Sequence, residues 1–272
     1  MLRFEPTASG NGELHIGHFA NLCLIQYISE EKGVPAGYIV DDLQITNDWN
    51  ENSISESNAK SNAINIQNTI AQLFPEMKDL GRFSDETYIK KMTEFYVFYE
   101  EKKCFEFNNM IYGIPNIAYR KSSNGYPIFD VLKCFYKKKD KPRSSYAFSP
   151  YYAHEVIDVF IGTTWQIVDS SLYDSYSYKL DNHIPSFNYY QFWSEILGRK
   201  PYGIILHPRL VDYNGNEISK SNGNNLYSID PLDTFEERAA SAFRMKKIDR
   251  RKIAEKLLNA KSMNPIRLAD VK

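Results

Sequence analysis

Residues 13–22 read ELHIGHFANL, and they place His15 and His18 around Gly17, directly before an apolar run with helical spacing. A helix N-terminus carries unpaired backbone N–H groups and the positive end of the helix dipole. Imidazole N–H groups at that position add directed donors. The stretch therefore predicts a helix whose first turn faces an anionic group such as phosphate. The alternative is that both histidines are incidental, because short patterns also arise by chance.

The segments on either side of this helix have the pattern of strands. Residues 2–4 form a short apolar segment, followed by a loop with proline and glycine. The helix is expected to end at Gly33. An apolar run at 37–40 then stops at Asp41 and Asp42, which is typical of a buried parallel strand with carboxylates at its C-terminal end. The order of strand, loop, helix and strand predicts a βαβ unit.

The rest of the chain alternates between helical and extended patterns. Apolar spacing, glycines and prolines set the expected boundaries. The expected elements are amphipathic helices at 51–72 and 85–103, a helix followed by a second core strand within 152–168, a helix at 189–197, a strand at 203–206 and charged helices within 233–260.

Residues 104–148 differ in composition from the rest of the chain, because short aromatic runs are broken there by prolines and glycine. We expect a β-rich inserted subdomain there. It ends in the basic run 137–143, which is either a solvated loop or a segment that contacts an RNA backbone. The expected organisation is a first half of the main α/β domain at 1–103, the insertion at 104–148, the second half of that domain at 149–225 and a short helical segment at 226–272.

Composition limits the classes of function. The 272 residues are 43% hydrophobic, and 33 Lys and Arg balance 34 Asp and Glu to a net charge of −1, so no global basic field favours nucleic acid. Cys23, Cys104 and Cys134 form no C-x-x-C pair, which argues against a disulfide framework and a structural zinc site. Without a signal-peptide pattern or an apolar run of ~20 residues, we expect a cytoplasmic protein and no membrane association.

A second polar signature lies about two hundred residues after the histidines. Residues 214–223 read NGNEISKSNG, with Lys220 between Ser219 and Ser221. A turn-rich loop with one lysine and flanking hydroxyls can close over a triphosphate and offset the charge that develops as pyrophosphate leaves. Each signature is weak alone, but together they point to one nucleotide site.

The two signatures together resemble the HIGH and KMSKS motifs of class I aminoacyl-tRNA synthetases. The segment RFEPTASG at 3–10, followed by LHIGH at 14–18, is similar to the R-F-x-P-x-x-x-G…L-H-I-G-H opening of the glutamyl and glutaminyl enzymes, with two extra residues before the first histidine. The resemblance covers roughly residues 1–225 and extends to YIVDDLQ at 38–44, DVFIGTT at 158–164, LYDS at 172–175 and HPRL at 207–210.

The resemblance implies an α/β fold with a doubly wound parallel sheet, the Rossmann-like class I synthetase catalytic core, that binds ATP at the strand ends. His15 and His18 would contact the phosphates, and Lys220 would hold the leaving pyrophosphate. These three side chains are the expected catalytic residues. The implied ATP-binding residues are His15, Gly17, His18, Ser219, Lys220 and Ser221.

The resemblance also implies an amino-acid pocket. Arg3 would pair with a substrate carboxylate and Asp41 with the ammonium group, although a surface ion pair and a helix cap are the alternatives. Val168 stands where glutamyl enzymes carry a second arginine, so glutamate is in doubt as the substrate, while glutamine or a related amino acid stays open. The implied pocket residues are Arg3, Ser9, Asp41, Tyr151, His154, Trp165 and Val168; Tyr151 lies one position from the family's substrate tyrosine, and His154 matches a pocket histidine of glutaminyl enzymes.

The expected function is that of an ATP-dependent ligase that forms an aminoacyl adenylate, with Mg²⁺ bound to the substrate, and passes the acyl group to tRNA. Only about fifty residues follow the lysine loop, where the family continues into an anticodon-binding domain, so the chain resembles a catalytic core alone. Glutamyl-queuosine tRNA synthetases share this shape, but Cys104 and Cys134 do not make their zinc-binding cluster, and we expect no zinc. The alternatives are a small-molecule, peptide or carrier-protein acceptor, or a catalytically silent tRNA-binding paralogue.

Overall fold

The computed structural model describes residues 1–42, 54–86, 203–216, 218, 227–230, 232–262 and 264–271, and the backbone of the strands between 104 and 188. The chain divides into two compact units. The first comprises Met1–Phe83, Trp165–Tyr173 and Ile204–Lys272, and the second comprises Ser84–Thr164 and Asp174–Gly203. The histidine stretch lies in the first unit, and the predicted insertion at 104–148 lies within the second.

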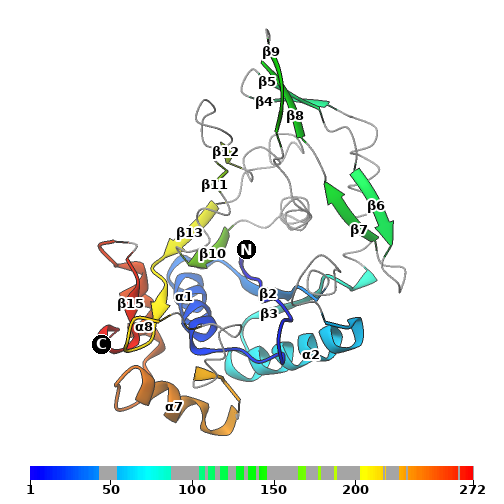
Figure 1. Cartoon of the computed structure of the whole chain (residues 1–272). Helices are drawn as coiled ribbons and strands as arrows, with labels where there is room; N and C mark the ends of the chain where they lie inside the picture. Colours follow the sequence, from blue (N-terminus) through cyan, green and yellow to red (C-terminus); the bar gives the residue numbers. More distant parts are fainter. Residues whose placement is uncertain are drawn as a thin grey trace. The chain divides into compact units, whose positions relative to one another are not determined.

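A five-stranded sheet forms the centre of the first unit (Figure 1). Strand β1 (Leu2–Phe4) pairs in parallel with β2 (Ala36–Val40) on one side and with β10 (Trp165–Asp169) on the other. The order is β13-β10-β1-β2-β3, with β3 at Lys78–Arg82 and β13 at Gly203–His207. The chain therefore proceeds outward from β1 in both directions, and β1 and β10 flank the point where the strand order reverses, where α/β sheets bind ligands.

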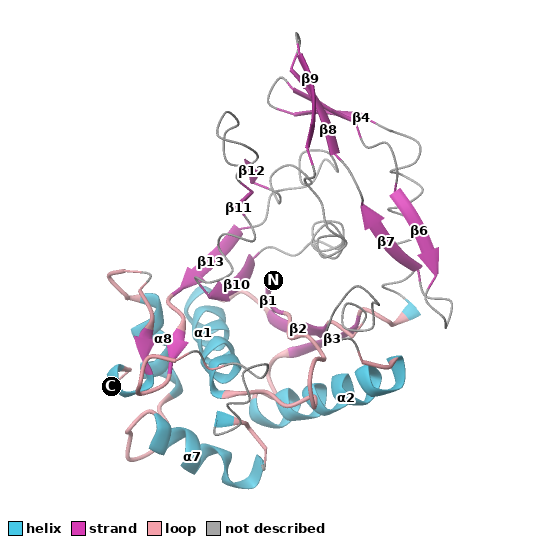
Figure 2. Ribbon diagram, in the orientation of Figure 1, coloured by secondary structure: helices cyan, strands magenta, loops and turns pink. Residues whose placement is uncertain are grey.

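Helix α1 (Ile16–Lys32) follows β1 and confirms the predicted helix. It is apolar on nearly every side, because the sheet lies against one face and α8 (Arg250–Leu258) packs on another (Figure 2). The helix ends at Gly33, whose left-handed φ of 61° suits glycine. Helix α2 (Glu56–Leu73) follows β2, starts at the N-cap Ser55 and packs on β2 and β3.

The C-terminal segment, from residue 232 onward, packs against α1 through α8. A 3₁₀ turn, η6 (Leu232–Thr234), leads into α7 (Phe235–Ala242), and a break separates α7 from α8. Strand β14 (Leu210–Val211) pairs in parallel with β15 (Ile266–Arg267), ahead of the final 3₁₀ turn η7 (Leu268–Asp270). Helical structure within 233–260 is thus confirmed.

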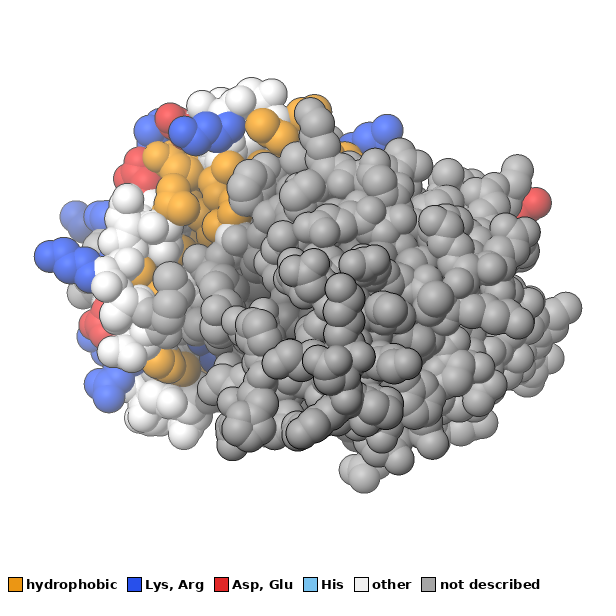
Figure 3. All heavy atoms as spheres, turned by 90° about the horizontal axis from the view of Figure 1, so that it is seen from above, with side chains coloured by type: hydrophobic (Ala, Val, Ile, Leu, Met, Phe, Trp, Pro, Cys, Tyr) orange, Lys and Arg blue, Asp and Glu red, His pale blue; other side chains and the backbone are white. Residues whose placement is uncertain are grey.

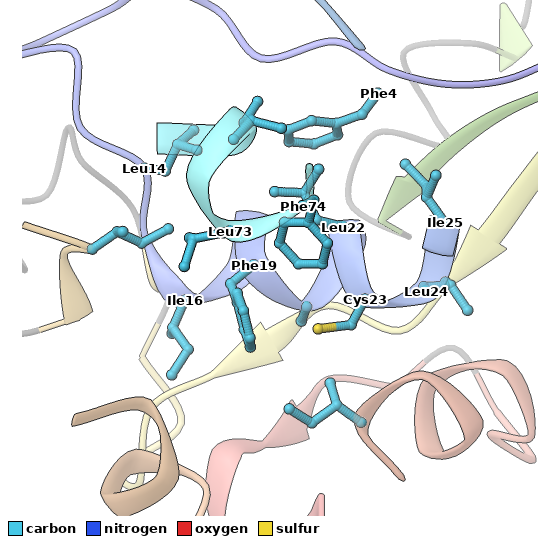
Figure 4. Close-up of a cluster of buried hydrophobic side chains, with 14 of the residues drawn as sticks. Phe4, Leu14, Ile16, Phe19, Leu22, Cys23, Leu24, Ile25, Leu73 and Phe74 are labelled. Atoms are coloured by element: carbon cyan, nitrogen blue, oxygen red, sulfur yellow. The ribbon is translucent and has the colours of Figure 1, made fainter. Parts of the chain in front are cut away.

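The core gathers around Phe19 of α1 (Figure 4). Its ring centroid lies 5.6 Å from that of Phe74 and 4.9 Å from that of Phe235, so α1, α2 and α7 meet there. Arg250 covers this cluster, with its guanidinium 4.6 Å from the Phe74 centroid. Cys23 lies fully buried nearby, and burial raises the pKa of its thiol far above the usual range.

The second unit contains antiparallel strands, as predicted for 104–148. A four-stranded sheet has the order β4-β5-β8-β9, formed by Cys104–Phe107, Met110–Gly113, Cys134–Lys138 and Lys141–Ser145. Two further antiparallel pairs are β6 (Ile117–Lys121) with β7 (Pro127–Val131), and β11 (Ser177–Tyr178) with β12 (Phe187–Asn188).

Most of the predicted strands and helices are confirmed, including β1, β2, β10 and β13. Three predicted helices lie outside the described residues: nearly all of 85–103, the helix that precedes β10, and 189–197. Strand β3 was not predicted. No helix in the described part of the chain is long and apolar enough to cross a membrane.

Candidate active site

The two histidines of the opening stretch form a reciprocal cap on α1. His15 is the N-cap, with extended backbone (φ −121°, ψ 172°), and its Nδ1 accepts a hydrogen bond from the Gly17 N–H at 3.1 Å. The backbone N–H of His15 in turn donates to Nδ1 of His18 at 3.2 Å. The imidazole rings stack with centroids 3.8 Å apart. The two histidines therefore have the spacing of a capping box, in which the side chains of the N-cap and N3 residues accept hydrogen bonds from backbone N–H groups of the first turn.

This cap also fixes the tautomer of both rings. A neutral imidazole has one N–H donor and one acceptor nitrogen. Because Nδ1 accepts in both His15 and His18, the proton of each neutral ring resides on Nε2. Each ring therefore carries its N–H on the nitrogen further from the backbone. The first turn of α1 thus combines two imidazole N–H donors with the positive end of a 17-residue helix.

Gly17 allows this arrangement by having no side chain. A Cβ at this position would lie 2.9 Å from Cε1 and 3.0 Å from Nδ1 of His15. The imidazole of His15 therefore occupies the space that a larger residue would need. The cap on α1 thus requires glycine at position 17 whether or not a ligand binds.

The loop before the histidines is fixed to both neighbouring elements of the sheet. Ala8 N–H donates to the Asp41 carbonyl at 2.8 Å, and Asp41 N–H donates to the Pro6 carbonyl at 3.0 Å. The Asn62 amide of α2 donates to the carbonyls of Ala8 at 3.2 Å and Gly10 at 2.9 Å. The backbone that leads from β1 to His15 is therefore held by the end of β2 and by α2.

The segment that follows the lysine loop returns to the histidines. Ser228 forms an antiparallel bridge with His15, and Ile229 N–H donates to the Leu14 carbonyl at 2.8 Å. Ser228 Oγ also donates to a Glu13 carboxylate oxygen at 2.5 Å. Arg238 of α7 donates to the carbonyls of Ser228 and Ile229, both at 3.1 Å. The loop that contains Lys220 therefore ends against the residues just before α1.

A polar turn holds the other end of the loop. Asp212 Oδ1 accepts hydrogen bonds from the N–H groups of Asn214 and Asn216, both at 2.8 Å, and Oδ2 accepts from the Asn216 amide at 3.1 Å. These donors, led by the backbone N–H of Asn216, lower the pKa of Asp212. Tyr213 donates to the Ala242 carbonyl at 2.6 Å, which attaches the turn to the end of α7.

The predicted pocket residues at the start of the chain are buried. Arg3 is 0% exposed and forms an ion pair with Glu5, and Asp41 is 1% exposed at the end of β2. Ser9 is partly buried, and its carbonyl accepts from the Gly12 N–H at 3.2 Å. The substrate roles of Arg3, Ser9 and Asp41 stay predictions.

Other predicted residues are placed only by their backbone or not at all. Trp165 and Val168 belong to β10, where Trp165 pairs with Leu2 of β1. Tyr151 and His154 lie outside the described residues, as do Ser219, Lys220 and Ser221. Among the residues that are described, no group of three or more His, Cys, Asp or Glu side chains could hold a metal ion.

Sequence reasoning missed several residues that build this site. Several of their contacts join segments far apart in the sequence, as for Ser228 with Glu13 and Asn62 with Gly10. The histidine spacing itself matches the capping box and could have revealed the reciprocal cap. The missed residues are Glu5, Glu13, Asn62, Asp212, Ser228 and Arg238.

The described part of the surface bears charges of both signs. On the face shown in Figure 3, the visible Lys and Arg side chains lie in separate groups between acidic, polar and hydrophobic ones.

No protein-family model and no curated protein sequence matches this chain. Among solved structures, a glutamate-tRNA synthetase from Elizabethkingia anophelis is similar with a TM-score of 0.52 and 9% identity, over 99% of this chain and 67% of that one. Glutamate tRNA ligase from Elizabethkingia meningosepticum gives 0.48 and 9%, over 82% of this chain and 52% of its own. Tyrosyl-tRNA synthetase from Archaeoglobus fulgidus gives 0.44 and 14%, over 91% and 65%.

The similarity to the Elizabethkingia anophelis enzyme shows the fold class. The chain has an α/β, class I synthetase-like fold built on a Rossmann-like parallel sheet. It spans about two thirds of the Elizabethkingia anophelis enzyme and about half of the Elizabethkingia meningosepticum one. At such low identity the similarity establishes the fold, and the chemistry has to be argued from the site.

Proposed function

We propose that this protein activates an amino acid with ATP. The amino-acid carboxylate attacks the α-phosphorus of ATP, a new C–O–P bond forms, and the bond to the β-phosphate oxygen breaks to release pyrophosphate. The product is an aminoacyl adenylate. Such a reaction needs reactants in line and donors for the charge that develops on the phosphates, which is what a preorganised site can supply.

The cap on α1 supports the phosphate-binding half of this proposal. His15 and His18 sit at a helix N-terminus, and the hydrogen bonds to Nδ1 leave Nε2–H as the donor of each neutral ring. Donors held in place by stacking and capping need little reorganisation when charge develops. The loop from β1 reaches this turn at the strand ends, where α/β folds bind nucleotides.

The observation that carries the proposal is the return of the lysine loop to the histidines. Ile218 is buried on one side of the loop, and Ser228 pairs with His15 on the other. Because the described residue Ser228, eight positions after Lys220, pairs with His15, we place Lys220 in the same site as the histidines. Lys220 would then offset the charge of the leaving pyrophosphate.

The proposed reaction has two substrates, ATP and the amino acid. ATP would bind as its magnesium complex, with the ion carried by the phosphates. The amino acid would lie at the point where the strand order reverses, between β1 and β10. Zinc has no part in this proposal.

An exchange assay tests the adenylation step. Amino-acid-dependent exchange of labelled pyrophosphate into ATP should occur with one or a few of the twenty amino acids. His18→Ala and Lys220→Ala should each lower the rate by about one to three orders of magnitude, because each removes one transition-state donor. Lys261→Ala, which changes an exposed lysine outside the site, is the matched control. Equal rates in all four proteins would overturn the proposal, provided thermal melts show that every variant is folded.

The acceptor that we propose is the end of a tRNA, held by the basic β8–β9 hairpin. The register pairs Lys138 with Lys141 and Tyr136 with Arg143, so these positions share one face of the hairpin. Because this hairpin would bind tRNA through only a few cationic side chains, it would neutralise few phosphates. The affinity for tRNA should therefore be modest and sensitive to salt.

Charge reversal separates this step from adenylation. The double variant Lys138→Glu, Lys141→Glu should weaken acyl transfer to total tRNA and leave pyrophosphate exchange unchanged. The matched control reverses Lys246 and Lys247, an exposed basic pair of the first unit. Normal adenylate formation with no transfer to any tRNA, even in the unmodified protein, would favour a small-molecule, peptide or carrier-protein acceptor instead.

A further inference from the structure

A buried ion pair lies on the central strand of the sheet. Arg3 of β1 is 0% exposed, and its guanidinium contacts the carboxylate of Glu5, whose side chain is 7% exposed. Neighbouring residues of a strand lie on opposite faces, so Arg3 is on the face of β1 opposite Phe4, whose ring lies 6.0 Å from that of His18 in an edge-on arrangement. Arg3 and the His18 ring therefore lie on opposite sides of the same short strand.

The pair sits at the position in the sheet where a substrate would bind. Arg3 pairs with Gly37 of β2 on one side and with Gln166 of β10 on the other. The strand order reverses between β1 and β10, and ligands of α/β folds bind outside the carboxyl ends at such a point. Glu5 directly follows β1 at that carboxyl end.

Carboxylates dominate the described part of this edge. Asp41 is 1% exposed and Asp42 is 3% exposed at the end of β2. The described cations at the same edge are Arg3 and, at the end of β3, the partly buried Arg82. Each buried charge needs a compensating partner, and Glu5 already provides one for Arg3.

We propose that Glu5 is a specificity-determining residue, which neutralises Arg3 and makes the site reject amino acids with an anionic side chain. This inference rests on the proposed function and adds to it the class of side chain that is accepted, neutral or cationic. An acidic substrate would have to displace Glu5 from Arg3, or place its own carboxylate beside that of Glu5. Either choice leaves like charges together in a buried place, which strongly disfavours binding.

Removal of the Glu5 charge should reverse this preference. In Glu5→Gln, the Arg3 guanidinium loses the charge of the Glu5 carboxylate, and a substrate carboxylate can replace that charge. We expect the ratio of kcat/KM for glutamate over glutamine, and for aspartate over asparagine, to rise at least about tenfold in pyrophosphate exchange. Glu5→Asp, which keeps the charge, should restore the original preference.

A binding measurement does not depend on turnover. Glutamate should raise the melting temperature of Glu5→Gln and have less effect on the unmodified protein, because it fills the vacated position beside Arg3. Glu236→Gln removes the carboxylate partner of another arginine, Arg250, on the C-terminal helices and is the matched control. It should show no such response to glutamate.

The outcomes separate two failures. Exchange with some amino acid, but an unchanged acidic-to-amide ratio and no glutamate-specific stabilisation in Glu5→Gln, would overturn the role of Glu5 and leave the proposed function intact. Absence of exchange with all twenty amino acids in the unmodified protein would overturn the proposed function and this inference with it. If Glu5→Gln does not fold, Glu5→Ala and the preference of the unmodified protein decide: a preference for glutamate over glutamine there would contradict the inference.

Discussion

Replacement of His15 by asparagine separates the two roles that this residue has in the account. As an N-cap, His15 accepts from the Gly17 N–H, and as a proposed phosphate ligand it donates through Nε2. Asparagine is among the best N-cap residues and can accept the same hydrogen bond, but it has no imidazole. Alanine removes both functions. The pair His15→Asn and His15→Ala therefore measures capping and chemistry independently.

The expected stability changes follow from the contacts. His15→Ala loses the cap, which costs about 1 kcal/mol, and the stacking on His18, which adds about 0.5–1.5 kcal/mol. For a chain of this size, each kcal/mol lowers the melting temperature by about 2–4 °C. His15→Asn should lose mainly the stacking and be the more stable variant. Loss of one transition-state donor should lower the exchange rate about 10²–10³-fold in both variants.

Thermal melts and pyrophosphate exchange on the three proteins provide the test. We expect His15→Asn to melt at a temperature between those of the unmodified protein and His15→Ala, because it keeps the cap and loses the stacking, and to be nearly as inactive as His15→Ala. A His15→Asn variant with an unchanged exchange rate would show that the imidazole is only a helix cap, and it would refute the phosphate role.

Three further outcomes concern the scaffold around the site. Gly12→Ala should cost more stability in urea unfolding than the ~1–2 kcal/mol expected for a positive-φ position such as Gly33, because a Cβ at Gly12 would lie 2.6 Å from the backbone of Asn62, whereas Gly33 faces open space. Because folding lowers the pKa of Asp212, this carboxylate stabilises the protein at pH values above 3.8, its pKa in the unfolded chain, and the stabilisation is lost as the pH falls through the lower pKa of the folded state. The difference in unfolding free energy between the unmodified protein and Asp212→Asn should therefore shrink when the pH is lowered below 3.8. A constant difference would contradict this. Cys23 should react with a thiol reagent only after unfolding, as peptide mass analysis can show, because its thiol is buried and its pKa raised; labelling in the native protein would refute this.

The sequence predicts the elements whose side chains repeat with a clear period. The apolar residues of β2 and α1 are almost entirely buried, so their pattern marks both the element and its end. Strand β3 reads KDLGR, with a single large apolar residue, Leu80, and it exists because its backbone pairs with β2 at the edge of the sheet. An element that depends on a neighbour rather than on its own side chains leaves little signal in a sequence.

The candidate site divides in the same way. The histidines and the lysine loop carry local motifs, so both were predicted. The contact of Ser228 with Glu13 joins residues 215 positions apart, and no local pattern in either segment predicts that they meet. The pairing of Glu5 with Arg3 is local, but only burial of both side chains distinguishes it from an ordinary surface ion pair. Tertiary contacts and burial thus supply what local pattern cannot.

The most direct measurement of the central claim is the identity of the products of one turnover. With ATP and the amino acid that supports exchange, the protein should release pyrophosphate and retain close to one aminoacyl adenylate per chain, detectable by mass spectrometry of the quenched mixture. Lys220→Ala should form it far more slowly. Release of inorganic phosphate and ADP in place of pyrophosphate and adenylate would contradict the account, because the attack would then occur at the γ-phosphorus and not at the α-phosphorus.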